Sequence, residues 1–163
     1  MADFTKAVNL TLVNEDGYVN DPRDPGGETN FGITKRSYPS LDIKSLTRAE
    51  AVAIYKRDFW NTFYDSISSQ FVANSLFDLG VLFGVHASVK TLQGVLMVST
   101  DGVFGPKSLA ATNSYGSSLL MNFKNALVAY AVAVVVRNPG DSVFLTGWTN
   151  RIRAVTMLVP SVC

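Results

Sequence analysis

The chain has 163 residues, the size of one globular domain or of two small domains that share a core. Hydrophobic residues make up 47% and charged residues 17%, a composition that excludes a disordered protein. There are 14 basic and 13 acidic residues, so the net charge of +1 gives no basic field that would indicate nucleic acid as a partner. The single cysteine and single histidine, Cys163 and His86, exclude an internal disulfide and the usual tetrahedral zinc site.

We expect neither a secretory signal nor a membrane-spanning segment in this sequence. Its first ten residues include Asp3 and hold no apolar run. The longest uncharged apolar stretch, residues 126–136, is eleven residues long. As a helix it would reach about 16 Å, about half of a hydrocarbon core of roughly 30 Å. We therefore expect a buried core helix there and no stable membrane insertion.

In chain order, the pattern of apolar residues predicts a mainly helical protein with one irregular excursion. Residues 15–34 hold four glycines, two prolines and five acids, which predicts a loop or a short twisted hairpin. Thr47 and Glu50 form a capping box that starts a helix. The nearly all-apolar helix over 71–82 is expected at the centre of the core. Helices are predicted over residues 4–14, 47–60, 71–82, 86–97, 106–111, 116–136 and 144–158.

A carboxylate that directly follows the first helix suggests catalysis. Glu15 comes at that helix end, Asp24 follows after eight residues and Thr29 after four more. Hydrolysis of a glycosidic bond needs a protonated carboxyl group for the leaving oxygen and a second group that stabilises the sugar cation or activates water. Partial desolvation would keep Glu15 protonated and a wetter turn would keep Asp24 ionised, while Thr29 could hold the water.

Spacing alone also permits simpler interpretations. Glu15 could be a solvated residue at a helix end, and Asp24, which precedes a proline, could be a turn residue. A calcium loop is not indicated, because the required register of aspartates and glycine is missing. Residues 105–108 lack the glycine spacing of a phosphate loop and place proline where a backbone donor is needed.

Four ordered motifs carry a resemblance to a known family. Residues 15–34 read E-D-G-Y-V-N-D-P-R-D-P-G-G-E-T-N-F-G-I-T, and residues 77–84 read F-D-L-G-V-L-F-G, followed by Leu92-Gln93. Residues 101–109 read D-G-V-F-G-P-K-S-L, and residues 144–151 read F-L-T-G-W-T-N-R. Together they resemble glycoside hydrolase family 108, whose members are lysozyme-like N-acetylmuramidases of bacteriophage endolysins and bacterial cell-wall enzymes.

The resemblance implies a mainly α, lysozyme-like fold with a small β-hairpin or loop excursion near residues 15–34. It implies a muramidase-like catalytic part over residues 1–85 and a helical part resembling a peptidoglycan-binding region over residues 86–163, packed together as one compact domain. The implied activity is cleavage of peptidoglycan between N-acetylmuramic acid and N-acetylglucosamine, with no metal or other cofactor. We expect a monomer whose partner is bacterial peptidoglycan.

The resemblance also assigns roles to residues. Glu15 is the implied general acid, with Asp24 and Thr29 as the second and third catalytic members. Asp16 and Leu82 depart from the family pattern, which usually has glycine and asparagine at these positions. Asp78 needs a partner, which Arg151 or Arg153 could supply, or else it lines the cleft; Trp148 is either a core residue or a sugar platform. Substrate contacts are predicted for Tyr18, Asn30, Asp78 and Trp148.

Two other functions stay open. A peptidoglycan cross-link endopeptidase would act on the same substrate, although the lack of histidine and cysteine argues against zinc and thiol mechanisms. A non-catalytic wall-binding virion protein could retain the same scaffold. For the leading function, the absence of a signal fits a phage lysin that is made in the host cytoplasm and acts on periplasmic or wall peptidoglycan, released at lysis or carried in the virion.

Overall fold

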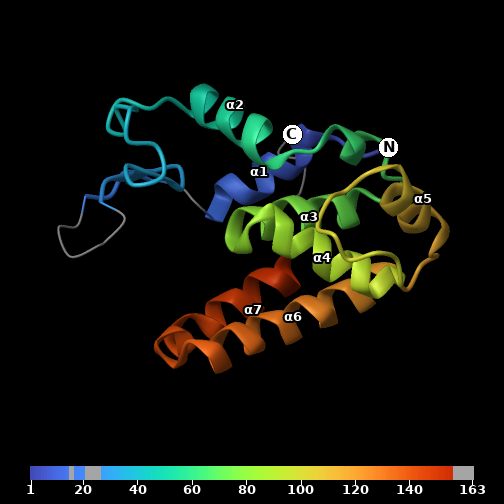
Figure 1. Cartoon of the computed structure of the whole chain (residues 1–163). Coiled ribbons are helices and arrows are strands. Elements are labelled where there is room, and N and C mark those ends of the chain that lie inside the picture. Colours follow the sequence, from blue (N-terminus) through green and yellow to red (C-terminus); the bar gives the residue numbers. More distant parts are fainter. Residues whose placement is uncertain (15–16, 21–26, 156–163) are drawn as a thin grey trace.

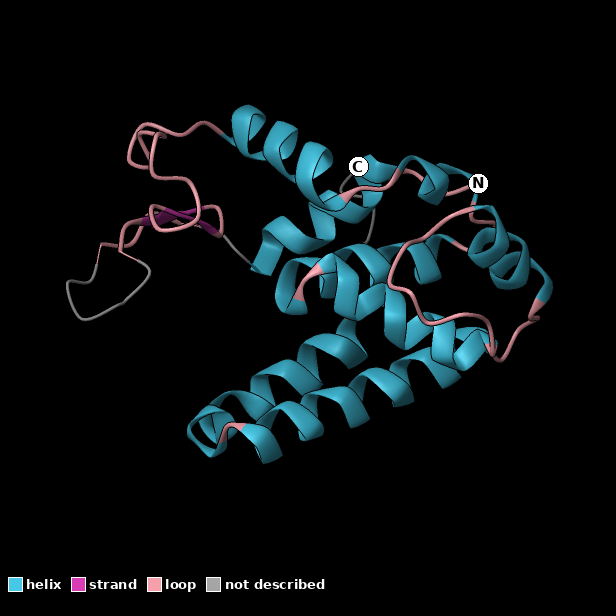
Figure 2. Cartoon of the chain, viewed as in Figure 1, coloured by secondary structure: helices cyan, strands magenta, loops and turns pink. Residues whose placement is uncertain are grey.

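The computed structural model describes residues 1–14, 17–20 and 27–155. Figure 1 shows a helical body with a loop region projecting from one end. The short sheet lies in that projecting region (Figure 2). The helices are α1 (Phe4–Asn14), α2 (Arg48–Phe59), α3 (Gln70–Phe83), α4 (Val85–Leu96), α5 (Pro106–Ser114), α6 (Leu119–Arg137) and α7 (Leu145–Ala154), with 3-10 helices η1 (Thr62–Ser66) and η2 (Pro139–Phe144) and strands β1 (Thr29–Asn30) and β2 (Ile33–Thr34).

The predicted mainly α fold with a small hairpin is confirmed, and several helix limits follow from local sequence. Helix α1 ends at Asn14, where the predicted helix ends. Helix α2 starts with the predicted capping box: the backbone N–H of Glu50 donates to Thr47 Oγ1 over 3.3 Å, and the Thr47 N–H donates to Glu50 Oε2 over 2.8 Å. Two otherwise orphaned backbone donors are satisfied in this way, which fixes the start of α2.

Helix α3 is the centre of the core, as its apolar sequence predicted. The ring of Phe77 meets three other aromatic rings edge-on, with centroid distances of 5.6 Å to Phe4, 6.1 Å to Tyr55 and 5.8 Å to Trp60. These rings come from α1, from α2 and from the residue that follows α2, so one side chain joins the first three helices. Edge-to-face contacts of this kind add to the free energy of burial.

The D-G-V-F-G-P-K-S motif of residues 101–108 has a structural role. Its loop wraps around the buried Gln93 of α4, whose Nε2 donates to Asp101 Oδ1 over 2.8 Å and to Ser108 Oγ over 3.1 Å. The backbone N–H of Gly102 donates back to Gln93 Oε1 over 2.8 Å. Gly102 has a φ of +76° and lies against the His86 ring, so a side chain would not fit there. The motif therefore locks the loop between α4 and α5.

The apolar stretch at residues 126–136 falls in α6, but the prediction that it is a buried core helix is wrong for most of it. Only four residues of α6 are buried: Leu119, Phe123, Leu127 and Ala131. They form one stripe at helical spacing, because α6 lies at the edge of the molecule beside α7 (Figure 1). Val136 is 74% exposed. By length and composition α6 is the one helix of the described residues that could cross a membrane, and 22% of its apolar window is buried.

The halves of the chain share one hydrophobic core, which runs from Ala2 to Ile152. The proposed division into residues 1–85 and 86–163 stays a prediction. The two 3-10 helices were not predicted, since single turns leave little periodic pattern. Helix α7 starts at Leu145, one residue later than expected, and the end of the predicted segment at residue 158 lies outside the described residues.

Candidate active site

Two of the three predicted catalytic residues, Glu15 and Asp24, lie outside the described residues. The surroundings of this region are nevertheless well defined. Helix α1 ends at Asn14, directly before Glu15 in the sequence, and the chain resumes at Gly27, shortly before Thr29. The site is therefore described by the end of α1, the hairpin and the elements that pack around them.

Helices α1 and α3 lie parallel, which determines what stands near the end of α1. The Asp3 N–H donates to Gln70 Oε1 over 2.8 Å at the start of both helices, and Thr11 Oγ1 donates to Asp78 Oδ1 over 2.8 Å further along. In each pair the two bonded residues are 67 positions apart in the sequence, so α1 and α3 run side by side in the same direction. The C-terminal end of α1 is thus beside the last turn of α3, which carries Leu82.

Asp78 is buried and fully engaged. Its side chain is 2% exposed, and Arg151 of α7 binds it with two contacts, Nε to Oδ2 at 2.9 Å and Nη2 to Oδ1 at 3.0 Å. The sequence analysis left Arg151 and Arg153 as possible partners of Asp78, and the structure shows that Arg151 is a partner. With the Thr11 hydroxyl, this ion pair connects α1, α3 and α7. The contact of Asp78 with substrate stays a prediction, and its visible role is to join these helices.

Trp148 borders a cavity of about 430 Å³ that is also lined by Leu82, Asn150 and Arg151. The indole ring is half-buried, meets the Phe83 ring edge-on at 5.3 Å and stacks on the Phe144 ring at 5.9 Å. Leu82 lies in the last turn of α3, beside the C-terminal end of α1. This cavity therefore lies toward the same end of the core as Asn14. Aromatic rings that border an open cavity suit the apolar faces of sugars. Substrate binding by Trp148 itself stays a prediction.

The hairpin presents Thr29 and Tyr18 on adjacent segments. Thr29 pairs with Thr34 across the sheet, and its backbone N–H and C=O both bond to Val19 over 2.8 Å. Its hydroxyl donates to the Gly27 carbonyl at 3.4 Å, a long bond that leaves it adaptable. The Tyr18 side chain is 40% exposed. Partial desolvation and the nearby Glu28 carboxylate raise the pKa of Tyr18, so its hydroxyl stays a hydrogen-bond donor at neutral pH.

Asn30 is buried beneath the hairpin. Its Nδ2 donates to the carbonyls of Ile43 over 3.1 Å and of Leu46 over 3.3 Å. These bonds fasten the loop that precedes α2 to strand β1. These hydrogen bonds give Asn30 a structural role. Contact between Asn30 and substrate stays a prediction.

The turn of the hairpin is strained at Phe31, which sequence reasoning did not select. Phe31 and Gly32 both have positive φ, +50° and +72°, as in the two-residue turns that favour Asn-Gly. A phenylalanine in this region is uncommon and costs free energy. The Tyr55 hydroxyl donates to the Phe31 carbonyl over 2.9 Å and holds it. Positive φ cannot be read from an aromatic residue, although the Gly32 that follows it was a usable signal of a turn.

Phe31 lines a second cavity, of about 160 Å³, with Leu12 and Val13 of α1 and with Arg48 of α2. The Arg48 guanidinium donates to Asn9 Oδ1 over 2.6 Å and so bridges α1 and α2. This cavity lies at the last turns of α1, and its lining combines the apolar Leu12, Val13 and Phe31 with the polar Asn9 and Arg48. Among the residues described, no three histidine, cysteine, aspartate or glutamate side chains are grouped to hold a metal ion.

The helical core and the hairpin after the first helix form a mainly α, lysozyme-like fold. The chain is similar to a solved structure described as Brucella abortus SagA, with 32% sequence identity and a TM-score of 0.77, covering 93% of this chain and 90% of that one. The model of the family Glycosyl hydrolase 108 matches residues 8–84. No sequence among curated proteins matches the chain. The chain belongs to glycoside hydrolase family 108.

Proposed function

We propose that the protein is an N-acetylmuramidase that cleaves the glycan strand between N-acetylmuramic acid and N-acetylglucosamine. Glu15 protonates the leaving oxygen, Asp24 stabilises the sugar cation or orients water, and Thr29 holds that water. The observation that carries the proposal is the family match over residues 8–84, a range that includes all three residues.

The surroundings of the proposed acid support this role. Glu15 follows α1 directly in the sequence, and the last turns of α1 line the cavity that includes Phe31 and Arg48. Thr29 stands on the hairpin that continues from this region. In this proposal the sugars also contact Trp148, which borders a cavity of its own.

The test is Glu15→Gln, which keeps the size of the side chain and removes its proton. General acid catalysis supplies roughly 10²–10⁴-fold in rate, so release of soluble fragments from purified sacculi should fall at least about 100-fold. Glu28→Gln, the same change on the same loop, is the matched control and should keep most of the activity. Retention of more than about a tenth of the wild-type rate by Glu15→Gln would refute the assignment.

Product analysis identifies the bond. Muramidase action creates new reducing ends on N-acetylmuramic acid, whereas cross-link cleavage creates new amino groups. Mass spectrometry of the digested sacculi separates these products. New amines without reducing ends would favour the endopeptidase, and pelleting of the protein with sacculi without any soluble product would favour a wall-binding virion protein.

For the biological setting we propose a phage lysin that reaches the wall from the host cytoplasm or from a particle. In this proposal residues 86–163 contribute wall binding. The loop locked around Gln93 borders a cavity of about 420 Å³ that includes Val103 and Lys107, which could hold a segment of the wall polymer. Expression in a bacterium together with a membrane-permeabilising protein should cause lysis that expression alone does not.

A further inference from the structure

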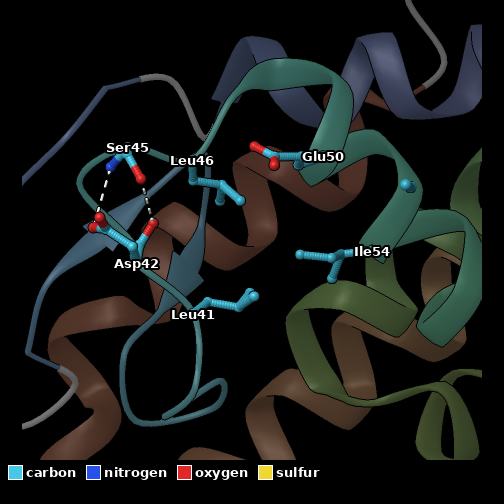
Figure 3. Close-up of a pocket in the computed structure, with 7 residues that line it drawn as sticks. Leu41, Asp42, Ser45, Leu46, Glu50 and Ile54 are labelled. Atoms are coloured by element: carbon cyan, nitrogen blue, oxygen red, sulfur yellow. Dashed lines mark hydrogen bonds between the residues drawn. The ribbon is translucent and has the colours of Figure 1, made fainter.

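A groove that the proposed chemistry does not use lies between α2 and the loop before it (Figure 3). The α2 groove, lined by Leu41, Asp42, Ser45, Leu46, Glu50, Ala53 and Ile54, has a volume of about 330 Å³. This volume is at the lower end of the roughly 300–1,000 Å³ of small-ligand sites. It is suited to a single side chain of a ligand.

The walls of the α2 groove are aliphatic. Leu46 and Ile54 are buried, with exposed fractions of 8% and 7%, and Leu41 is half-buried. Figure 3 shows the side chains of Leu41, Leu46 and Ile54 directed into the space between the loop and α2. Ala53 adds a small side chain on the α2 side, so no bulky group fills the opening. Such walls favour a hydrocarbon chain through the hydrophobic effect.

Two carboxylates lie on the rim of the groove. Asp42 Oδ1 accepts from the Ser45 N–H at 3.4 Å, and Glu50 Oε2 accepts from Thr47. The hydrogen bonds to Ser45 and Thr47 lower the pKa of Asp42 and of Glu50, so both are ionised at neutral pH. The rim is therefore negative above an apolar interior.

Lys35 is the cation whose charge acts on Asp42. Lys35 Nζ donates to the Leu41 carbonyl over 2.6 Å, which holds the lysine at the back of the loop. Its charge lowers the pKa of Asp42 only as the smallest of several contributions. An incoming ligand that combines an aliphatic chain with a terminal ammonium group would match both the walls and the charge of the groove.

We propose that the α2 groove binds the amine-terminated side chain of the diamino acid in the stem peptides that peptidoglycan carries on its muramic residues. The methylene groups lie on Leu41, Leu46 and Ile54, and the ammonium group meets Asp42 and Glu50. This inference rests on the proposed function and names its substrate more closely: glycan strands whose stem peptides have a free amino group.

The groove is mechanically tied to the hairpin of the proposed catalytic site. Asn30, the neighbour of Thr29 in β1, holds the carbonyls of Ile43 and Leu46 in the groove's loop. The charge of Asp42 also contributes to the raised pKa of Tyr18, so these two side chains lie within electrostatic reach. A peptide seated in the α2 groove would thus hold its glycan strand next to Thr29 and Tyr18.

Kinetics on three forms of one glycan preparation test the proposal: strands with intact stem peptides, the same strands with their amino groups acetylated, and strands stripped of peptide. For the wild type we expect kcat/KM on intact strands to exceed the other two by about tenfold, mainly through a lower KM. Asp42→Asn, and Ala53→Leu, which fills the groove, should abolish this preference and leave the rate on stripped strands unchanged. Ala49→Leu, an exposed position on the same helix, and Asp141→Asn, a carboxylate of η2, are the matched controls and should keep the preference.

A binding measurement separates this inference from the proposed function. Nuclear magnetic resonance titration of the wild-type protein with stem tripeptides ending in lysine or in diaminopimelate should shift the amides of Leu41 and Ala53. The tripeptide with an acetylated side-chain amine should shift them at least tenfold more weakly. Equal rates on intact and acetylated strands, or no shift with either free amine, would overturn the inference even if Glu15→Gln abolishes cleavage. A preserved shift in a protein that cleaves no glycan would uphold the groove and refute the muramidase.

Discussion

Removal of the arginine from the buried ion pair should strongly destabilise the protein. Arg151→Met keeps an unbranched apolar side chain but leaves the Asp78 carboxylate, which is 2% exposed, with the Thr11 hydroxyl as its remaining described partner. Breaking a buried pair by removing one member costs about 3–5 kcal/mol, because the other charge stays buried without compensation. For a chain of 163 residues, each kcal/mol lowers Tm by roughly 2–4 °C, so we expect a decrease of roughly 6–20 °C.

Urea unfolding followed by circular dichroism measures the change in free energy. The double variant Asp78→Leu with Arg151→Met should be more stable than Arg151→Met alone, because no charge is then left buried. Arg137→Met is the control: its exposed guanidinium bonds to the Ala133 carbonyl of its own helix, so the loss should stay within about 0.5 kcal/mol. A loss below about 1 kcal/mol for Arg151→Met, or a double variant less stable than the single one, would refute the reasoning.

Three further predictions concern backbone and caps. Phe31→Asn should be more stable than Phe31→Ala by about 0.5–1 kcal/mol, because both variants lose the partly buried ring and asparagine accepts positive φ more readily; equal stability in urea would contradict the strain at this position. Gly102→Ala should lower the unfolding free energy by at least about 2 kcal/mol, because the added Cβ would meet the His86 ring and the backbone has positive φ. Gly94→Ala, in the open face of α4, is the control and should be neutral or stabilising by up to about 1 kcal/mol. Urea unfolding measures both variants, and equal effects would contradict the geometry. Thr47→Ala should cost about 0.5–2 kcal/mol at pH 7. The pKa of Glu50 is lowered from 4.5 in the folded state, so its contribution is present above about pH 4.5 and is lost as the pH falls through the folded value. The difference from wild type should therefore shrink at pH 3, and a difference that grows there would contradict the cap.

Elements that depend on neighbouring residues were predictable from the sequence. The end of α1 at Asn14 follows from the dense run of turn formers after it, and the start of α2 follows from Thr47 and Glu50. The core position of α3 follows from its composition. In each case the deciding interactions lie within a few residues along the chain, where spacing and residue type determine them.

Features that depend on tertiary packing were not predictable. The choice of Arg151 over Arg153 as the partner of Asp78 depends on which face of α7 meets α3, which the order of residues does not state. The exposure of α6 depends on how many neighbours cover it. For the site, the sequence alone selected Glu15, Asp24 and Thr29, of which the structure describes Thr29. The sequence named Trp148 as a possible sugar platform, but the cavity that it borders and the strained backbone of Phe31 required the fold.

The tie between Asp78 and Arg151 has a consequence for engineering. Wall-degrading enzymes are often recombined by cutting between a catalytic and a targeting module, and the chain of this protein suggests such a cut near residue 85. A fragment that stops there would lose α7 and leave Asp78 of α3 without its arginine partner. Chimeras should therefore exchange only the outward-facing surface of α5 and α6, or replace Asp78 by leucine before the halves are separated.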